Sequence, residues 1–239
     1  MDMLKLIPQL FFDLISRVVP GSVAIIMIAA AADLKLGKLA HDFWDGATAI
    51  QESALFLGFG FGVAAYLVGQ LISPISDFVE NQLAKRLFPA YYQILKTAVS
   101  NSVEYSPFLR SFLIKELGLK PETGAGQIAG GQYRNAVFVW YDWLRVNSPD
   151  AGARAAKIRA EYRMHSQNAV AFMTALIVHS ALAYLQQHNL NPALILVMTA
   201  GSLASLWATA RTYRTFQWAV INQFYSAKTS GVTTQTGGQ

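Results

Sequence analysis

Few residues of this chain are of the types that carry covalent chemistry. The 239 residues include no cysteine, which excludes a thiol nucleophile, a thiolate metal site and a disulfide. His179 and Ser202 lie in apolar stretches and could form the dyad of an intramembrane hydrolase, but no GxSxG or other acyl-transfer motif accompanies them. His41, His165 and His188 stand apart, without the spacing of metal ligands. We therefore predict no catalytic residue, no metal and no cofactor.

His179 lies within an apolar stretch, and two roles are open to it. A histidine is costly to bury at membrane depth without a partner, so it is a candidate for function there. It could instead be a neutral ring bonded to a neighbouring hydroxyl or carbonyl group, which is the interpretation we favour.

Basic residues offer a stronger prospect, which is the binding of an anionic ligand. Two arginines lie in the aromatic segment YRNAVFVWYDWLR, and four bases crowd the stretch before the third apolar run. Arginines beside aromatic rings can pair with phosphates and stack on bases. The predicted ligand-binding residues, for a nucleotide or oligonucleotide, are Arg134, Arg145, Arg154, Lys157, Arg159 and Arg163. Two other interpretations stay open: the aromatic helix packs inside a domain or against headgroups, and the bases attract anionic lipid.

A glycine-rich segment, KPETGAGQIAGGQ, precedes the aromatic segment. It is not a P-loop, because no Gly-Lys-Ser/Thr follows, and no strand precedes it as a dinucleotide fingerprint requires. We predict a linker here, with a ligand-contacting loop as the alternative.

The elements that position these residues are helices suited to a membrane. The chain is 53% hydrophobic and only 14% charged, whereas soluble domains carry roughly 25% charged residues. Three charge-free runs, 53–76, 168–185 and 190–210, each approach or exceed the length of about 20 residues that a spanning helix needs. A fourth span is predicted from about Arg17 to Ala32. It follows an interfacial turn with an Asp13–Arg17 pair, and Pro20 with Gly21 can bend the chain into the bilayer.

Basic residues also predict the orientation of the spans. Of the 19 Lys and Arg residues, only Lys35 and Lys38 lie in the first loop, and none lies in the short second turn. The positive-inside rule therefore places both termini and the middle segment in the cytoplasm. We predict an all-α integral membrane protein with four transmembrane helices in two hairpins and a helical cytoplasmic insertion between them. Its parts are 1–76, an interfacial helix and first hairpin; 77–166, the cytoplasmic domain; 167–210, the second hairpin; and 211–239, a cytoplasmic tail with a disordered end.

Punctuation within the middle segment predicts helix boundaries. Ser106 with Pro107 and Ser148 with Pro149 are typical helix starts, and Gly118 suits a helix end. No breaker follows Gly152 until residues 189–192, so one helix is predicted from about Pro149 through the third span.

The second span carries a face of small residues. Ala54, Gly58, Gly62, Ala65, Gly69 and Ser73 recur at spacings of three or four. Small residues allow close helix contact in lipid, where no hydrophobic force joins helices. The residues predicted to line a pore or pack helices are Gly58, Gly62, Gly69, Gln70 and Ser73. We predict a homo-oligomer, with a tetramer as one candidate size.

The segments FFDLISRVVPG and SPDAGARAAKIRAEYRMHSQNAVAFM resemble those of bacterial multi-pass membrane effectors in anti-phage defence operons, including the channel-forming effector of Hailong-type systems. The resemblance implies an oligomeric effector in the bacterial inner membrane, which stays closed until a nucleotide or oligonucleotide signal at its cytoplasmic domain changes. No motif transfers a ligand site to particular residues.

These observations favour a non-enzymatic protein, a homo-oligomeric pore or channel that contacts membrane lipid and is gated by an anionic ligand. The first alternative is a non-conducting membrane scaffold or sensor that recruits a cytoplasmic partner. The weakest alternative is the intramembrane hydrolase.

Overall fold

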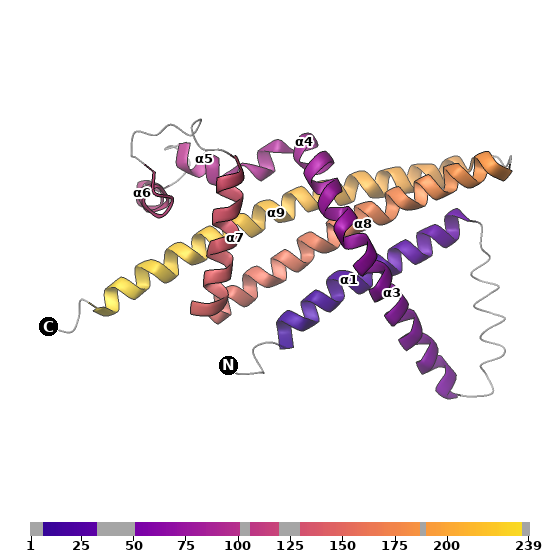
Figure 1. Ribbon diagram of the computed structural model, residues 1–239, viewed down its shortest axis with the longest axis horizontal. Coiled ribbons are helices and arrows are strands. Elements are labelled where there is room, and N and C mark those ends of the chain that lie inside the picture. Colours follow the sequence, from indigo (N-terminus) through magenta and orange to yellow (C-terminus); the bar gives the residue numbers. More distant parts are fainter. Residues whose placement is uncertain (1–6, 33–50, 101–105, 120–129, 187–189, 236–239) are drawn as a thin grey trace. The chain divides into compact units, whose positions relative to one another are not determined.

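A computed structural model shows the chain as a succession of helices (Figure 1). It describes residues 7–32, 51–100, 106–119, 130–186 and 190–235, and no strand occurs within these ranges, so the all-α prediction is confirmed. The elements are α1 (Ile7–Ala31), α3 (Gln51–Val79), the π-helix η2 (Glu80–Ala84), α4 (Lys85–Leu87), the 3-10 helix η3 (Pro89–Tyr92), α5 (Ile94–Ser100), α6 (Pro107–Glu116), α7 (Gly130–Asn147), α8 (Pro149–Gln186) and α9 (Pro192–Gln235).

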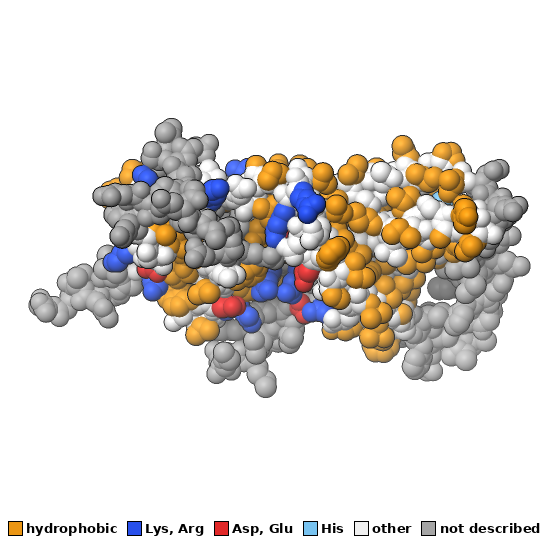
Figure 2. Space-filling model, turned by 45° about the horizontal axis from the view of Figure 1, so that its top comes forward, with side chains coloured by type: hydrophobic (Ala, Val, Ile, Leu, Met, Phe, Trp, Pro, Cys, Tyr) orange, Lys and Arg blue, Asp and Glu red, His pale blue; other side chains and the backbone are white. Residues whose placement is uncertain are grey.

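Four helices are long and apolar enough to cross a membrane. They fall within Phe11–Ala31, Gly58–Leu87, Pro149–Leu185 and Pro192–Ser230. Figure 2 shows a broad region of hydrophobic side chains without Lys, Arg, Asp or Glu among the described residues on that face. Because such a surface is costly to expose to water, the chain is a membrane protein.

The first of these helices differs from its prediction. α1 is one helix that runs through Pro20, and its apolar part begins at Phe11 instead of about Arg17. Proline is tolerated inside membrane helices because its surroundings can satisfy the freed carbonyl group. The helix therefore continues through Pro20 and Gly21, where we predict a bend, and the first loop of 33–50 lies outside the described residues.

The chain divides into two compact units. Unit 2 comprises 10–87 and 160–209, and unit 1 holds the described residues of 88–159 and 210–239 with the start of α1. The boundaries of these units differ from those of the predicted cytoplasmic domain of 77–166 at both ends. Its first residues continue α3 through η2 and α4 within unit 2, and residues from Ala210 onward join the helices of unit 1.

Unit 2 is assembled around a contact between the backbones of α1 and α3. A Cβ added to Gly21 would overlap the carbonyl oxygen of Ala65, and one added to Gly69 would overlap that of Arg17. Only glycine lets two helices approach so closely. Gly69 thus packs against α1, while a Cβ on Gly58 or Gly62 would meet nothing within 4 Å.

The second half of unit 2 packs α8 between α1, α3 and α9. Val170 and Ala171 of α8 join Ala24 of α1 and Ile72 of α3 in one apolar cluster. Ala175 of α8 joins Ala31 of α1 and Met198 of α9 in another. Figure 1 shows α3 crossing α1 and α8 obliquely.

Unit 1 is held together by aromatic rings. Trp140 of α7 stacks on Phe224 of α9 with ring centroids 5.0 Å apart, and Tyr92 of η3 stacks on Tyr213 of α9 at 4.8 Å. The described part of the predicted tail is helical, because α9 continues to Gln235, and it supplies this core. The sequence signal was an apolar stripe at Tyr213, Phe216, Val220 and Phe224, on the face that is buried beyond Arg211.

The helix boundaries follow the predicted signals. α6 begins at Pro107 after Ser106, and α8 begins at Pro149 after Ser148 and runs unbroken to Gln186. Gly118 has φ +64°, and the amides of Gly118 and Leu119 donate to the carbonyls of Lys115 and Ile114. This pair of bonds is the Schellman motif that ends many helices at glycine.

Substitution of the contact glycine tests the packing of unit 2. Gly69→Ala should lower the free energy of unfolding by about 1–3 kcal/mol, because the new methyl group overlaps the α1 backbone. Gly62→Ala, on the same helix but in open space, should leave it unchanged or raise it by up to about 1 kcal/mol. Unfolding in mixed micelles, followed by circular dichroism, measures both variants. Equal effects would contradict the backbone contact.

Candidate functional site

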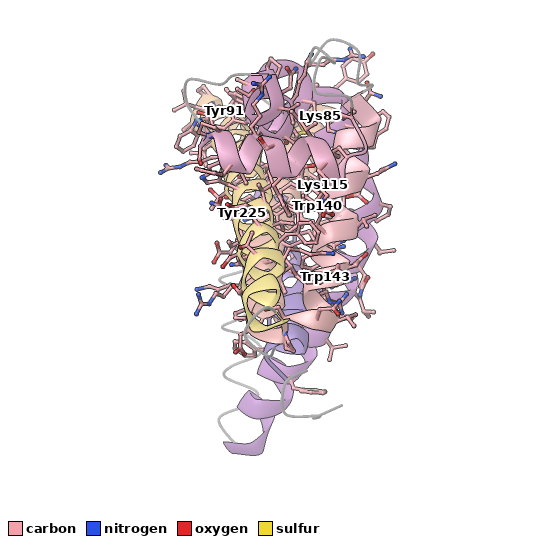
Figure 3. All side chains as sticks on the ribbon, turned by 90° about the vertical axis from the view of Figure 1, so that its left-hand side faces the viewer. Lys85, Tyr91, Lys115, Trp140, Trp143 and Tyr225 are labelled. Atoms are coloured by element: carbon pink, nitrogen blue, oxygen red, sulfur yellow. The ribbon has the colours of Figure 1, made fainter. Side chains whose placement is uncertain are left out.

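The aromatic face of α7 is turned toward α9. Trp143 meets Phe224 edge-on at 5.2 Å, in addition to the stacked Trp140, and Tyr141 meets Phe216 at 5.5 Å. Figure 3 labels Trp140 and Trp143 of α7 and Tyr225 of α9 in this region. The structure thus supports the interpretation in which this helix packs inside a helical domain. Trp140 and Tyr141 are buried and are not offered to a ligand.

Two of the predicted ligand-binding arginines are engaged within unit 1. The guanidinium of Arg159 lies over the rings of Phe138 and Tyr141, at 5.3 and 5.1 Å from their centroids. Arg145 pairs with Asp142 at 3.8 Å and lies 5.8 Å from the Tyr141 ring. A cation over an aromatic face is attracted by the ring's quadrupole, so Arg159 of α8 serves the packing of α8 against α7, while these contacts of Arg145 lie within α7.

The other predicted bases separate into different situations. Arg163 belongs to unit 2 and pairs with Asp13, and its contact with a ligand stays a prediction. Lys157 lies in the unit 1 part of α8 and has an interaction of its own. Arg134 lies in α7, but its side chain is outside the described residues, as is the glycine-rich linker up to residue 129.

Arg154 is the predicted base that lines a pocket. The pocket has a volume of about 500 Å³ and lies between the end of α7, the start of α8 and the last turns of α9. Its lining residues are Trp143, Asn147, Ser148, Asp150, Ala151, Arg154, Gln223, Ser226, Ala227 and Ser230. Among the residues that the structure describes, Arg154 has no hydrogen-bond or ion-pair partner.

Local sequence explains why this pocket forms. α7 ends at Asn147 and α8 begins at Pro149, so only Ser148 separates the two helices and they meet at a sharp corner. Gly152 sits in that corner, where an added Cβ would lie 2.8 Å from the Cα of Arg145.

The charge of the pocket is mixed. Arg154 is the one cation among the described residues of its lining, and Lys228 of α9, which is not part of the lining, has its ammonium 5.1 Å from the centroid of the Trp143 ring. Asp150 adds one carboxylate to the lining, and hydroxyl and amide groups supply the rest. An anionic group held by Arg154, with an uncharged polar remainder, fits this arrangement.

His179 has the structural role that we favoured. Its Nε2 accepts a hydrogen bond from the Asn191 amide at 3.2 Å, and its Nδ1 lies 3.1 Å from the carbonyl oxygen of Ala31. Since Nε2 accepts, the proton of the neutral ring is on Nδ1 and is donated to Ala31. The ring joins the end of α1 to the start of α9. Ser202 donates to the carbonyl of Met198 at 2.8 Å, so each member of the supposed dyad has other partners.

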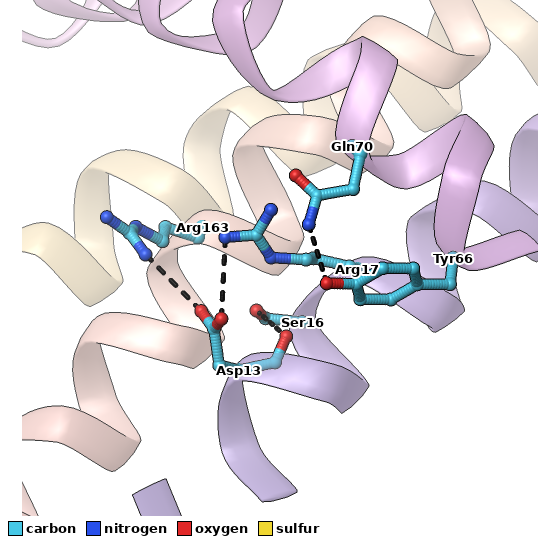
Figure 4. A network of polar contacts seen from close by, with 6 residues as sticks. All are labelled: Asp13, Ser16, Arg17, Tyr66, Gln70 and Arg163. Carbon is cyan, nitrogen blue, oxygen red and sulfur yellow. Dashed lines mark hydrogen bonds and ion pairs between the residues drawn. The ribbon is translucent and has the colours of Figure 1, made fainter. Parts of the chain in front are cut away.

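Polar contacts join α1 to α8 in unit 2, and a hydrogen bond within α3 is drawn beside them (Figure 4). Asp13 pairs with Arg17 at 3.4 Å, as predicted, and with Arg163 of α8 at 3.5 Å. On α3, the Gln70 amide donates to the Tyr66 hydroxyl at 2.7 Å, and the Ser73 carbonyl accepts from the Ser76 hydroxyl. Gln70 and Ser73 are each half-buried in the single chain, so they would line a pore, as predicted, only if several copies of the chain assembled around it.

One buried ionisable residue is not among the predicted site residues. Glu80 is 1% exposed, although it lies beyond Ser76, where the charge-free run ends. The available signal was the apolar residues on both sides of it, Phe78 and Val79 before and Leu83 after, which carry the helix past Ser76. Buried ionisable groups in membrane helices are expensive and therefore mark functional candidates.

No family model, curated protein or solved structure was found to match this chain.

A pair of arginine substitutions separates packing from ligand contact. Arg159→Gln should lower the free energy of unfolding by about 0.5–2 kcal/mol, because it removes a cation from two ring faces. Arg154→Gln, five residues earlier on the same helix, should change it by less than about 0.5 kcal/mol. The measurement is again unfolding in mixed micelles. A larger loss at Arg154 than at Arg159 would reverse the assignment.

Removal of the His179 ring nitrogens tests its bridging role. His179→Phe should lower the free energy of unfolding by about 1–3 kcal/mol, since the Asn191 amide and the Ala31 carbonyl lose their partner. Ser180→Ala, at the exposed neighbouring position, is the control and should have no measurable effect. Wild-type stability in His179→Phe would mean that the bridge does not hold the helices.

Proposed function

We propose that this protein is a homo-oligomeric membrane effector that forms a pore or channel gated by an anionic ligand. The observation that carries the proposal is the presence, in one chain, of four apolar helices and of a compact unit whose pocket is lined by Arg154, an arginine without a hydrogen-bond or ion-pair partner among the described residues. Such a division suits a protein that senses a ligand in water and responds in lipid. Its helices are proposed to form two hairpins with both termini in the cytoplasm, in the inner membrane of a bacterium.

Glycine usage supports the oligomer. At Gly21, Gly69, Gly152 and Gly201 an added Cβ would come within 3 Å of another part of the chain. Gly58, Gly60 and Gly62 of α3 have nothing within 4 Å, although each glycine costs a helix about 1 kcal/mol relative to alanine. In the apolar part of α3 only 17% of the residues are buried, fewer than in the other three spans. If α3 of a second copy packed against this α3, Gly58, Gly60 and Gly62 would allow close contact between the two helices, as the other glycines do within the chain.

The pocket supports an anionic ligand. Arg154 supplies positive charge to the pocket lining, and Trp143 supplies an aromatic surface in the same lining. A nucleotide or oligonucleotide has the matching parts, namely phosphates and stacking bases. The role in anti-phage defence rests on the resemblance of the two segments at 11–21 and 148–173.

A membrane scaffold or sensor is the second candidate. The observation that favours it is a set of exposed apolar side chains in unit 1, among them Phe108 of α6 and Val139 and Val146 of α7. A protein partner that covers these side chains would remove apolar surface from water.

Ion flux through the purified protein in liposomes tests the leading proposal. Wild-type protein should conduct ions, and nucleotides or short oligonucleotides should change the flux. Gly62→Leu should reduce flux at least tenfold without unfolding the chain, because the leucine fills the open side of α3 and keeps copies apart. Arg154→Gln should keep the flux and lose its response to nucleotides, whereas Arg214→Gln, a base outside the pocket lining, should keep both.

A membrane that stays tight to ions with wild-type protein under every condition would exclude the pore. The exposed face of unit 1 would then be used to capture the partner of a scaffold. Monomers alone after crosslinking in membranes would exclude the oligomer.

A further inference from the structure

Helix α3 loses its regular hydrogen bonding at two places near its end. Pro74 has no N–H, so the carbonyl of Gln70 loses its usual donor within the helix. Six residues later the π-helix η2 begins at Glu80, and the Lys85 amide reaches back five residues to the Glu80 carbonyl. Proline and π turns are the common causes of bends in helices, and π turns are frequent at functional sites.

The segment between these two places is fixed to α8. The Ser76 hydroxyl donates to the carbonyl of Ser73 at 2.7 Å, a local bond that competes with the helix and often bends it. The Ser76 carbonyl accepts a hydrogen bond from the Ser166 hydroxyl of α8 at 3.2 Å. Both serines are buried, so this bond has no water to replace it.

The π turn determines which side chains of α3 are buried. Ile72, Ser76, Glu80 and Ala84 are all buried, at a constant spacing of four residues. In an α-helix of 3.6 residues per turn, that spacing drifts by about 40° at each step and would carry Ala84 off the face. A wider π turn compensates the drift, so it keeps Glu80 and Ala84 on the buried side while Phe78, Leu83 and Leu87 stay exposed.

We propose that residues 74–84 of α3 form a hinge, which the Ser166–Ser76 hydrogen bond holds in the described position. Release of that bond lets the π turn revert toward α-helix, which rotates the end of α3 and turns the Glu80 carboxyl out of its buried place. The hinge needs only the internal contacts of unit 2, and its role as the gate rests on the proposed function. A turn of Glu80 toward the conduction path would place a negative charge there and favour cations.

The absence of cysteine from the chain allows a direct test by spin labelling. Labels at Leu71→Cys and Leu87→Cys lie on either side of the hinge, at positions 72% and 54% exposed, so they disturb little packing. A straight α-helix would separate these Cα atoms by about 24 Å, at 1.5 Å per residue. Dilution with unlabelled protein keeps distances between copies out of the measurement.

Three substitutions in the labelled protein decide the proposal. Pro74→Ala should narrow the distance distribution and shift its peak toward the straight-helix value, because the Gln70 carbonyl regains a donor. Ser166→Ala should broaden the distribution, because it removes the bond that holds the hinge. Ser180→Ala, an exposed serine farther along α8, should leave the distribution as in the wild type. Distributions that do not differ among all four proteins would overturn the hinge.

Flux measured on the same proteins separates this proposal from the pore. If the distances respond as expected and flux rises in Ser166→Ala, the hinge is the gate. If the distances respond while every protein leaves liposomes tight to ions, the hinge stands and the pore fails. If wild-type flux is present but unchanged in both Pro74→Ala and Ser166→Ala, the pore stands and the hinge does not gate it.

Discussion

Helix α1 meets α3 backbone to backbone at Gly21 and Gly69, and the rest of unit 2 is arranged around that contact. In lipid no hydrophobic force draws apolar helices together, so attraction depends on how closely their backbones can approach. The crossing brings Ala24 and Ile72 to the same face of α8, where Val170 and Ala171 complete a cluster. It also leaves the first half of the apolar part of α3 uncovered, which is why that half is available to another molecule.

Polar groups in unit 2 are placed where they tie helices together. His179 joins the end of α1 to the start of α9, and Asp13 joins α1 to α8 through Arg163. Ser166 joins α8 to α3. A buried donor or acceptor without a partner costs more than a formed hydrogen bond contributes, so these bonds specify which helices are neighbours. The same logic makes the buried Glu80 notable, because a carboxyl group is the costliest of these groups to hold away from water.

Unit 1 is built by different physics, since aromatic rings of α7 and α9 supply its core. Some of the arginines that the sequence predicts as ligand contacts interact with these rings instead. Arg159 covers Phe138 and Tyr141, and Arg145 pairs with Asp142, which leaves Arg154 facing the pocket. A basic cluster in a sequence therefore overstates the charge that a ligand would meet, because cation–π contacts and ion pairs use part of it.

The sequence by itself determined the helices and their membrane character. Charge-free runs favour lipid over water because of their own side chains. The Ser-Pro starts of α6 and α8 and the end at Gly118 follow from local backbone geometry. Neither effect depends on residues far away in the chain. Tertiary structure alone decided which glycines touch a backbone, which bases stay unpartnered, that the end of α9 belongs to unit 1, and that Glu80 is buried. Each of these depends on contacts between residues far apart in the chain, and spacing along one helix shows which residues share a face without showing what that face meets.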